Sequence, residues 1–506
     1  MGFLHGLYAG AAAAGGELLA IDGSQGRMTY AEILERADRI SARLARAGAG
    51  AGARIGVADS LGVDLYPVVL AVSALDCSIA SFVEDGNSNE VRRLERLGVR
   101  ATIVGGEPGM VEVTRLATAL DAVRLADECY VLSTSGSTSA PKDVAISDRN
   151  VESYAAHLRA CARVQPGDRI SQNYKPHFDA FYEVLLMAVL GHGTIVVPDG
   201  RENVLVERFC NRWGVTVWNS VPSQVTMAFR LRQLTPGSLP DVKLAVFGGE
   251  SLSSQCLSLW RQAAPASIVV NSYGPAESTI AIAEYVMPTD LAVGDGDVPI
   301  GTVLPHMEHC LVEPEGAPGE LELCVRGPQV FGGYLDCGHD VGRFYLEDSG
   351  EHRLRTEGRP DLDDWYRTGD IVSEGPDGLV FRRRLNQEVK VRGKRVDLAA
   401  VEAELRRHSG VSDARAIVLD DAVHAIVEAA EPDVRDKPID VRGLRDYARP
   451  HTVVWVGSLP RLANGKSDIR AMEQLLRRGR REWTSAVTGA AQADEWHRYG
   501  AGEHGH

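Results

Sequence analysis

The sequence lacks the features that mark nucleic-acid-binding and membrane proteins. Positive charge is scarce: 54 Lys and Arg stand against 69 Asp and Glu, for a formal net charge of −15. A protein that neutralises many phosphates needs a basic surface, so nucleic acid is not an expected partner. No apolar run reaches the roughly 18–20 residues that span a bilayer. No Lys or Arg precedes the alanine run within residues 1–14, which argues against a signal peptide.

The cysteines form no CxxC pair and no Cys/His metal spacing. The eight are Cys77, Cys129, Cys161, Cys210, Cys256, Cys310, Cys324 and Cys337. Such wide spacing favours reduced, mostly buried thiols over a disulfide framework or a zinc site. With 44% hydrophobic and 24% charged residues, the chain is predicted to be a large cytoplasmic α/β protein.

Length and periodicity predict several layers of strands and helices. A chain of 506 residues corresponds to roughly three units of about 150 residues. Thr29 is a capping residue, and Ile33, Ala37 and Ile40 follow it at helical spacing, which predicts a helix that ends near Gly48. Short apolar runs between turn residues predict buried strands at 101–104, 130–132, 194–197, 244–247 and 267–270.

From about Gly301 the pattern changes. The alternating segment Gly319–Arg326 and its crowded turn signals predict a smaller β-rich part. Beyond Asn386, a strand-like segment and an amphipathic helix at 398–407 predict a separate small α/β unit. We therefore expect a large N-terminal domain over 1–385, a small C-terminal domain over 386–483 and a flexible tail over 484–506.

Three stretches carry residues suited to nucleotide chemistry. In Tyr130–Val144 small hydroxyl residues surround a glycine and precede Lys142, so backbone N–H groups, hydroxyls and a mobile charge can approach a phosphate. In Asn271–Ile280 an aromatic ring and Glu277 suit a base and a magnesium ion. In Trp365–Val372 Asp370 follows a glycine turn and could accept ribose hydroxyls. Taken singly, each stretch is more often an ordinary turn than a site; the three together are a much stronger indication.

Two further stretches follow in the same order, RLNQEVKVRG at 384–393 and PRLANGKSD at 460–468. With them, the chain from about Thr29 to Ile469 resembles the adenylate-forming superfamily, and within it the amino-acid-activating adenylation domains of nonribosomal peptide synthesis. The resemblance implies an α/β fold: βα-layered subdomains with a small β-barrel-like part, then a small mobile α+β domain.

The resemblance also implies a reaction without a protein nucleophile. The carboxylate of an amino acid attacks the α-phosphorus of ATP and pyrophosphate leaves, so alignment and charge stabilisation do the catalysis. The catalytic residues would be Lys466, which bridges the carboxylate and the α-phosphate, Lys142, and the magnesium ligand Glu277. Asn386 would be the hinge, and Gly393 would lie near an incoming thiol. The implied ATP-binding residues are Thr134, Ser135, Gly136, Ser137, Thr138, Lys142, Gly249, Tyr273, Gly274, Glu277, Asp370 and Arg384.

The amino-acid pocket is implied in the same way. Asp179 matches the aspartate that holds the α-amino group, although it could also cap the following helix. The other matching positions are Ala180, Glu183, Asn219, Val246, Gly248, Ser272, Ile280 and Ala281, with Lys466 at the carboxylate end. A buried Glu183 needs a partner, and the distal ammonium of a lysine, β-lysine or ornithine would supply one. If a one-residue deletion makes Glu183 structural, a small neutral amino acid such as alanine is the alternative.

The sequence departs from the family pattern at several positions. Ser139 and Asp143 replace glycines in the phosphate loop, where Asp143 would repel ATP unless it points away. Asp148, Ala276, Arg383, Asn386, Glu388 and Leu462 are further departures. None removes an essential charge, so an active enzyme is expected rather than a non-catalytic nucleotide-binding relative. An acid–CoA or amide ligase is disfavoured by Asp179.

The chain length bears on the partner. A carrier domain needs at least about 50 residues, and a short tail follows Arg481. We therefore expect the enzyme to load the phosphopantetheine thiol of a separate carrier protein in trans.

Overall fold

The structure, a computed structural model, divides into two compact units. One contains residues 1–368 and 372–381, and the other contains 369–371 and 382–506. The described residues are 2–84, 88–106, 110–116, 127–134, 142–200, 202, 204–287, 298–314, 317–348, 351–385, 388–391, 394–419, 422–430, 439, 441, 444, 448–461 and 467–482. The predicted domain boundary after residue 385 stays a prediction, and the predicted tail 484–506 lies outside the described residues.

Among the described residues no helix is both long and apolar enough to cross a membrane. The cytoplasmic location stays a prediction.

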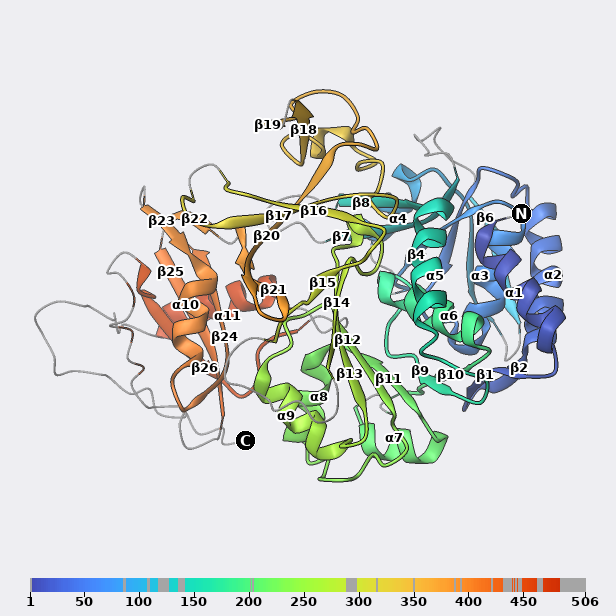
Figure 1. The fold of residues 1–506 in the computed structure, drawn as a ribbon, viewed down its shortest axis with the longest axis horizontal. Coiled ribbons are helices and arrows are strands. Elements are labelled where there is room, and N and C mark those ends of the chain that lie inside the picture. The colour runs from blue at the N-terminus through green and yellow to red at the C-terminus, as the bar shows by residue number, and fades with distance from the viewer. Residues whose placement is uncertain are drawn as a thin grey trace, which may run out of the picture. The chain divides into compact units, whose positions relative to one another are not determined.

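One sheet of the larger unit (Figure 1) has six strands, in the order β6-β5-β3-β4-β7-β8. Its strands are β3 (Arg54–Ala58), β4 (Ser78–Phe82), β5 (Val99–Gly105), β6 (Val111–Arg115), β7 (Glu128–Thr134) and β8 (Lys142–Ser147). The inner strands run parallel, and the edge strands β6 and β8 run antiparallel to their neighbours. Parallel strands covered on both faces are apolar throughout, which is why their sequences showed runs rather than alternation.

Another sheet of the same unit has nine strands, in the order β15-β14-β13-β12-β11-β9-β10-β1-β2. Its strands are β1 (Leu19–Gly23), β2 (Gly26–Thr29), β9 (Arg169–Ser171), β10 (Thr194–Val197), β11 (Val217–Ser220), β12 (Leu244–Gly248), β13 (Ile268–Tyr273), β14 (Ala283–Met287) and β15 (Thr302–Val303). Strands β11, β12 and β13 are parallel neighbours. All five strands predicted from apolar runs are confirmed.

The helices of this unit are α1 (Phe3–Gly15), α2 (Tyr30–Arg46), α3 (Leu65–Ala74), α4 (Ser88–Arg96), α5 (Asp148–Cys161), α6 (Asp179–Gly191), α7 (Val206–Trp213), α8 (Pro222–Arg230) and α9 (Ser254–Ala263). Short 3-10 turns cover Gly62–Asp64, Ala276–Ser278 and Cys337–His339. The predicted start of α2 is confirmed: Thr29 accepts from the backbone N–H of Glu32, and the Glu32 carboxylate accepts from that of Thr29. This reciprocal capping box satisfies two donors that a helix start leaves open.

Strand alternation separates two cores on the faces of the nine-stranded sheet. Val217, Val246 and Val270 belong to a core shared with α2, α3, α5 and α6. Trp218, Phe247 and Val269 point the other way, into a core with α7, α8 and α9. Because side chains two apart share a face, Asn219, Gly248 and Ser272 lie on the α6 side. The cores therefore decide which strand residues can line a site next to α6.

The predicted β-rich part is a second six-stranded sheet, β16-β17-β20-β18-β19 with β21 on β20. Its strands are β16 (Glu308–Val312), β17 (Leu321–Arg326), β18 (Phe344–Asp348), β19 (Glu351–Leu354), β20 (Trp365–Gly375) and β21 (Gly378–Arg384). The sequence alternation in β17 is not an alternation of burial, because Glu322, Leu323, Cys324 and Val325 are all buried. Arg367 donates to Glu322 at 2.7 and 3.0 Å, which compensates for burying that carboxylate.

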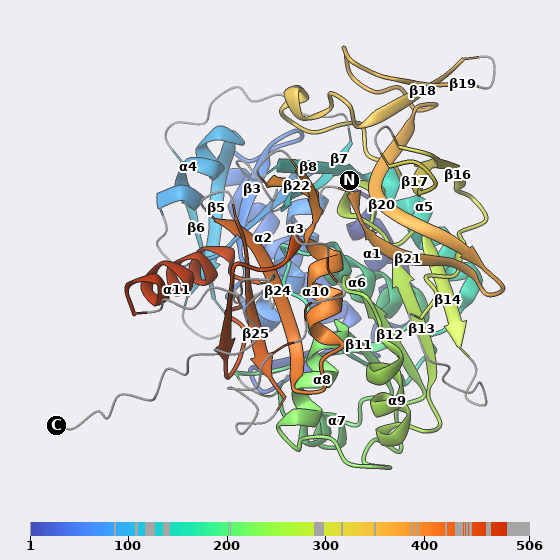
Figure 2. The same ribbon diagram turned by 90° about the vertical axis from the view of Figure 1, so that its left-hand side faces the viewer.

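The smaller unit is an α/β sandwich with its own core, seen from the front in Figure 2. Its elements are β22 (Glu388–Val391), β23 (Lys394–Asp397), α10 (Leu398–Arg406), β24 (Val411–Leu419), β25 (Ala422–Ala429), β26 (Thr452–Val456) and α11 (Ile469–Glu482). Val401 and Leu405 of α10 pack on one face of β24–β25, and Met472 and Leu476 of α11 pack on the other. The predicted amphipathic helix is confirmed.

Candidate adenylation site

Three parallel strands end at the same edge of the nine-stranded sheet and carry predicted pocket residues there. Asn219 on β11 lies opposite Val246 on β12, and Gly248 on β12 lies opposite Ser272 on β13. Ligands of open α/β sheets bind outside the carboxyl ends of such strands. The fold thus brings together four residues that are far apart in the sequence.

Helix α6 supplies Asp179, Ala180 and Glu183. Asp179 is the first residue of the helix, and its Oδ1 accepts from the backbone N–H of Ala180 at 2.9 Å. Glu183 is 4% exposed in an otherwise apolar helix. Tyr154 Oη of α5 donates to one Glu183 carboxylate oxygen at 2.7 Å, and Asn219 Nδ2 lies 3.4 Å from the other. Glu183 therefore lies on the strand side of α6, next to the predicted pocket residue Asn219.

The surroundings of Glu183 favour its neutral form when no cation is near. Burial raises its pKa to about 7, against the hydrogen bond from Tyr154, and the charge of Glu284 adds to the shift. Asn219 directs its amide nitrogen to Glu183, and its Oδ1 is fully buried and has no hydrogen-bond partner among the described residues. Buried polar atoms are normally paired. The Glu183 carboxylate and Asn219 Oδ1 could therefore both accept hydrogen bonds from the same ligand group.

The Tyr174 hydroxyl lies within the electrostatic influence of both predicted pocket carboxylates. Burial, followed by the charges of Glu183, Glu250 and Asp179, raises its pKa.

The loop after β13, which carries the predicted pocket residues Ile280 and Ala281, is strained. Thr279 and Ile280 have φ of 59° and 68°, a region that β-branched residues rarely adopt. Gly274 packs so closely on this loop that a Cβ would lie 2.5 Å from the carbonyl oxygen of Ile280. The buried Gln329 amide donates to the carbonyls of Ser278, Thr279 and Ala281 at 3.2, 3.0 and 2.8 Å. Gln329 thereby holds the pocket residues Ile280 and Ala281 in place.

Tyr334 contacts both Lys142 and Glu277, which are predicted to bind the ATP phosphates and magnesium. Its hydroxyl donates to Glu277 Oε1 at 2.7 Å, and Lys142 Nζ lies 4.9 Å from the centre of its ring. Burial and the charge of Arg343 lower the pKa of Lys142, whereas Glu277 and Asp340 oppose that shift. Glu277 is buried, and a single carboxylate of this kind suits Mg²⁺, which takes most other ligands from phosphates and water.

The phosphate loop itself is described only at its ends. Thr134 at the end of β7 pairs with Lys142 at the start of β8, whereas Ser135, Gly136, Ser137 and Thr138 lie outside the described residues. Asp143 follows Lys142 and is buried between Arg93 and Arg96, each at 3.0 Å. Burial would raise the pKa of Asp143, but Arg93, Ser133 and Arg96 hold it below its usual value. The two arginines therefore offset the negative charge of Asp143, which would otherwise repel ATP.

Asp370 and Arg384, predicted to contact the ribose, form an ion pair. Arg384 Nε donates to Asp370 Oδ1 at 2.7 Å. Asp370 is buried, and the Arg384 side chain is about half exposed. One carboxylate oxygen is thus fixed by Arg384. Tyr273 lies at the end of β13, half-buried, and Gly249 has φ of 78°, which glycine adopts without strain.

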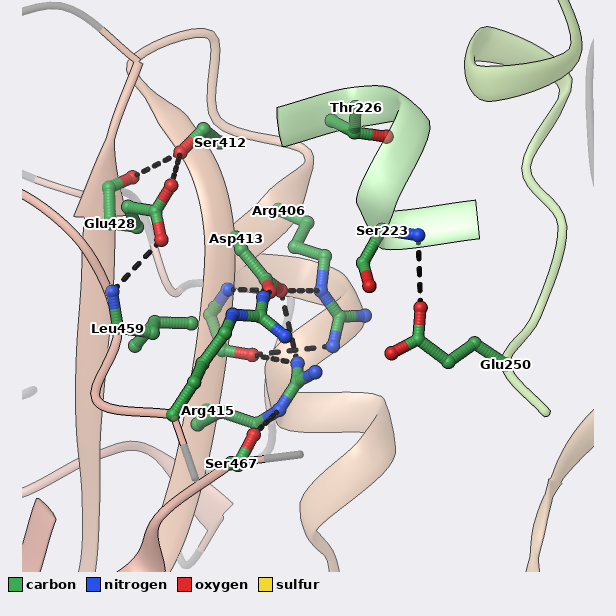
Figure 3. A network of polar contacts seen from close by, with 12 residues as sticks. Ser223, Thr226, Glu250, Arg406, Ser412, Asp413, Arg415, Glu428, Leu459 and Ser467 are labelled. Atoms are coloured by element: carbon green, nitrogen blue, oxygen red, sulfur yellow. Dashed lines mark hydrogen bonds and ion pairs between the residues drawn. The ribbon is translucent and has the colours of Figure 1, made fainter. Parts of the chain in front are cut away.

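The segment that carries Lys466 is anchored at both ends, although Lys466, like Asn386 and Gly393, lies outside the described residues. Arg461 and Ser467 pair across the segment. Arg461 donates to Asp413 at 2.9 Å, and Ser467 accepts from Arg415 at 2.9 Å. Figure 3 shows how Arg406 and Arg415 converge on Asp413 next to Ser467. Burial would raise the pKa of Asp413, but Arg415, Arg406 and Arg461 hold it low.

The sequence motifs missed several of these residues. Tyr154, Gln329, Tyr334 and Asp413 each touch or position a predicted site residue. Tyr154 and Gln329 lie in no motif with recognisable chemistry, and they reach the site through tertiary contacts alone. Tyr334 follows the glycines Gly332 and Gly333, a turn signal that gave no reason to expect contact with Glu277.

Comparisons with known proteins identify the family. The model of the AMP-binding enzyme family matches residues 87–335. The chain is 29% identical to an isonitrile lipopeptide synthase of Streptomyces coeruleorubidus, over 92% of this chain and 33% of that protein. The chain thus spans about a third of that relative's length.

Solved structures agree with this result. The protein IdnL7 is 26% identical, with a TM-score of 0.74 over 94% of this chain and 99% of that one. A four-domain nonribosomal peptide synthetase, AB3403, bound to AMP and glycine, shares the fold at 20% identity with a TM-score of 0.70, over 92% of this chain and 36% of that one. The predicted fold class is confirmed: the chain belongs to the adenylate-forming superfamily of AMP-binding enzymes and has the fold of an adenylation domain.

Proposed function

We propose that this chain activates an amino acid with a second basic group, such as lysine, β-lysine or ornithine. ATP and the amino acid would give the aminoacyl adenylate and pyrophosphate. The single observation that carries this substrate class is the buried Glu183 with the unpartnered Asn219 Oδ1 beside it. A distal ammonium would donate to both atoms and supply the charge that a buried carboxylate needs. Membership of the superfamily supports ATP as the second substrate.

The residues divide the work between the two ends of the substrate. Asp179 would bind the α-ammonium, while Glu183 and Asn219 bind the distal one. Lys466 would draw the carboxylate to the α-phosphate and stabilise the charge that develops there. Lys142 and the Ser135–Thr138 loop would hold the phosphates, and Glu277 would hold a magnesium ion that neutralises the leaving pyrophosphate. Tyr273 would stack on adenine beside Gly249 and Gly274, and Asp370 with Arg384 would hold the ribose.

One observation favours a second candidate, a small neutral amino acid such as alanine. Tyr154 and Asn219 already donate to Glu183, and a pKa of about 7 lets the carboxyl remain neutral without a ligand. If the substrate is a small neutral amino acid, Glu183 is a structural part of the pocket wall, and the small residues Ala180, Gly248 and Ala281 determine the size of the side chain that is accepted. The two candidates differ in how binding responds to pH.

We predict that the affinity for lysine rises with pH while that for alanine does not. An ammonium binds the ionised Glu183, so below the pKa of about 7 each lysine bound must displace a proton. The ratio of the Kd for alanine to the Kd for lysine should increase up to about tenfold per unit from pH 5 to pH 7 and then level off. Calorimetric titration of both ligands measures this ratio. Because both carry the α-ammonium that Asp179 would bind, any effect of pH on Asp179 cancels in the ratio. In Glu183→Gln the ratio should be flat; a flat ratio in the native chain would favour the neutral substrate.

We further propose that the adenylate is transferred to the phosphopantetheine thiol of a carrier protein supplied in trans, after rotation of the smaller unit about Asn386. When this 506-residue chain is incubated with a separate holo-carrier protein, coenzyme A, ATP and labelled lysine, the carrier should become labelled. A carrier without phosphopantetheine is the control. Label on coenzyme A but not on any carrier tested would support the acid–CoA ligase instead.

A further inference from the structure

Two cysteines that are far apart in the sequence lie directly opposite each other in the β-rich sheet. Strands β16 and β17 are neighbours (Figure 1) and run antiparallel. Their register pairs Cys310 with Cys324. Opposed residues of an antiparallel pair have Cα atoms about 4.5 or 5.5 Å apart, depending on the hydrogen-bonding pattern. A disulfide needs a Cα separation of about 4.4–6.8 Å. The backbone is therefore already positioned for a bridge, although both thiols are free in this structure.

The two thiols differ in exposure, as the partners of a reactive pair should. Cys324 is fully buried in a small cluster with Tyr345 and Trp365, whereas Cys310 is half-buried at its edge. His352 Nε2 lies 3.4 Å from Cys310 Sγ. The His352 ring packs beside Tyr345 and Trp365, at 6.0 and 6.1 Å between ring centres. Cys310 Sγ can thus be reached by a reagent from solvent, whereas Cys324 Sγ is buried on the opposite strand.

The charges around the pair assign the roles of the two sulfurs. A hydrogen bond from Cys324 lowers the pKa of Cys310 against the effect of burial and the charge of Glu347, and the Arg326 charge also lowers it. The same hydrogen bond, with burial, raises the pKa of Cys324. The thiolate is the nucleophile in thiol chemistry. Cys310 is therefore the attacking sulfur and Cys324 the resolving one.

We propose that Cys310 and Cys324 are a redox-active dithiol that a hydroperoxide oxidises to a cross-strand disulfide, a site separate from adenylation. The Cys310 thiolate attacks the distal peroxide oxygen; an S–O bond forms, the O–O bond breaks and, with one proton, an alcohol leaves. Cys324 then attacks the sulfenic sulfur of Cys310; the S–S bond forms, the S–O bond breaks and hydroxide leaves as water with the Cys324 proton. Two thiols and one hydroperoxide thus give one disulfide, one alcohol and one water. A thiol reductant reverses the reaction.

The experiment treats the folded full-length chain with hydrogen peroxide, blocks the remaining thiols by alkylation and identifies peptides by mass spectrometry. We expect a peptide pair joined through Cys310 and Cys324 that disappears after treatment with dithiothreitol. The exposed Cys337 is the internal control, since it has no opposed cysteine and should not enter an intramolecular bridge. The readout is the covalent state of two sulfurs, so it does not depend on the proposed adenylation activity.

Two variants separate the roles. In Cys324→Ala, which has no donor at this position, Cys310 should stop at the sulfenic acid, which a dimedone probe captures, and its alkylation midpoint should rise toward the ordinary pKa of about 8.5. In Cys310→Ser, Cys324 should stay reduced because it is buried. Absence of the Cys310–Cys324 linkage in the native chain, or oxidation of Cys310 no faster than that of Cys337, would overturn the proposal. An unchanged alkylation midpoint in Cys324→Ala would also contradict it.

Discussion

Lys466→Ala should lower the rate of amino-acid-dependent pyrophosphate exchange by about 10²–10³-fold, the usual loss when a group that stabilises transition-state charge is removed. Lys466 is proposed to contact the reacting carboxylate and α-phosphate. The loss should fall mainly on kcat, because the charge it stabilises develops during the reaction. Its segment is anchored independently through Arg461 and Ser467, so the fold should remain intact by circular dichroism and thermal melting.

A matched control is Arg470→Ala, which removes an exposed cation four residues further along. That variant should retain the native exchange rate. A normal rate in Lys466→Ala would refute the assigned role of the lysine. An unfolded Lys466→Ala variant would contradict the view that the anchors, rather than the lysine, hold the segment.

Glu183→Gln should reduce kcat/KM for lysine by about 10²-fold or more and change that for alanine by less than about threefold. Removing one partner of a buried charge pair costs about 2–5 kcal/mol, largely because the other charge remains buried and unpaired. The glutamine can still accept from Tyr154 Oη, so the wall of the pocket keeps its shape. Exchange kinetics with each amino acid measure the two effects.

Tyr154→Phe is the matched control, since it removes the 2.7 Å hydrogen bond to Glu183 but keeps the carboxylate. It should affect lysine and alanine similarly and preserve the preference for lysine. If Glu183→Gln instead weakens both substrates equally, Glu183 packs the pocket wall and the cationic substrate is wrong. In that case Tyr154→Phe and Glu183→Gln should have the same substrate profile.

The sequence predicted those parts of the fold that depend on local pattern. The capping box at Thr29, the buried parallel strands and the amphipathic helix near Val401 each follow from residues close in the chain. The order of the motifs then implied the superfamily. Burial of Glu322 in a segment that alternates was not predicted, because its partner Arg367 lies 45 residues away.

The predictable part of the site is likewise the part that lies in motifs. Parallel pairing of β11, β12 and β13 brings Asn219, Val246 and Ser272 to one edge, as a strand-end site requires. The clamp of Gln329 on the strained Thr279–Ile280 loop could not be read from the sequence, because only the folded backbone reveals which carbonyls it reaches. The opposition of Cys310 and Cys324 was hidden for the same reason: it depends on strand register.

The most direct test of the account is exchange of labelled pyrophosphate into ATP by the native chain over a panel of lysine, β-lysine, ornithine, L-alanine and D-alanine. We predict strong exchange with at least one diamino acid and weak exchange with both alanines. Preference for alanine would contradict the role proposed for Glu183 and Asn219. No exchange with any amino acid would contradict the proposed adenylation itself and favour a nucleotide-binding relative without catalytic activity.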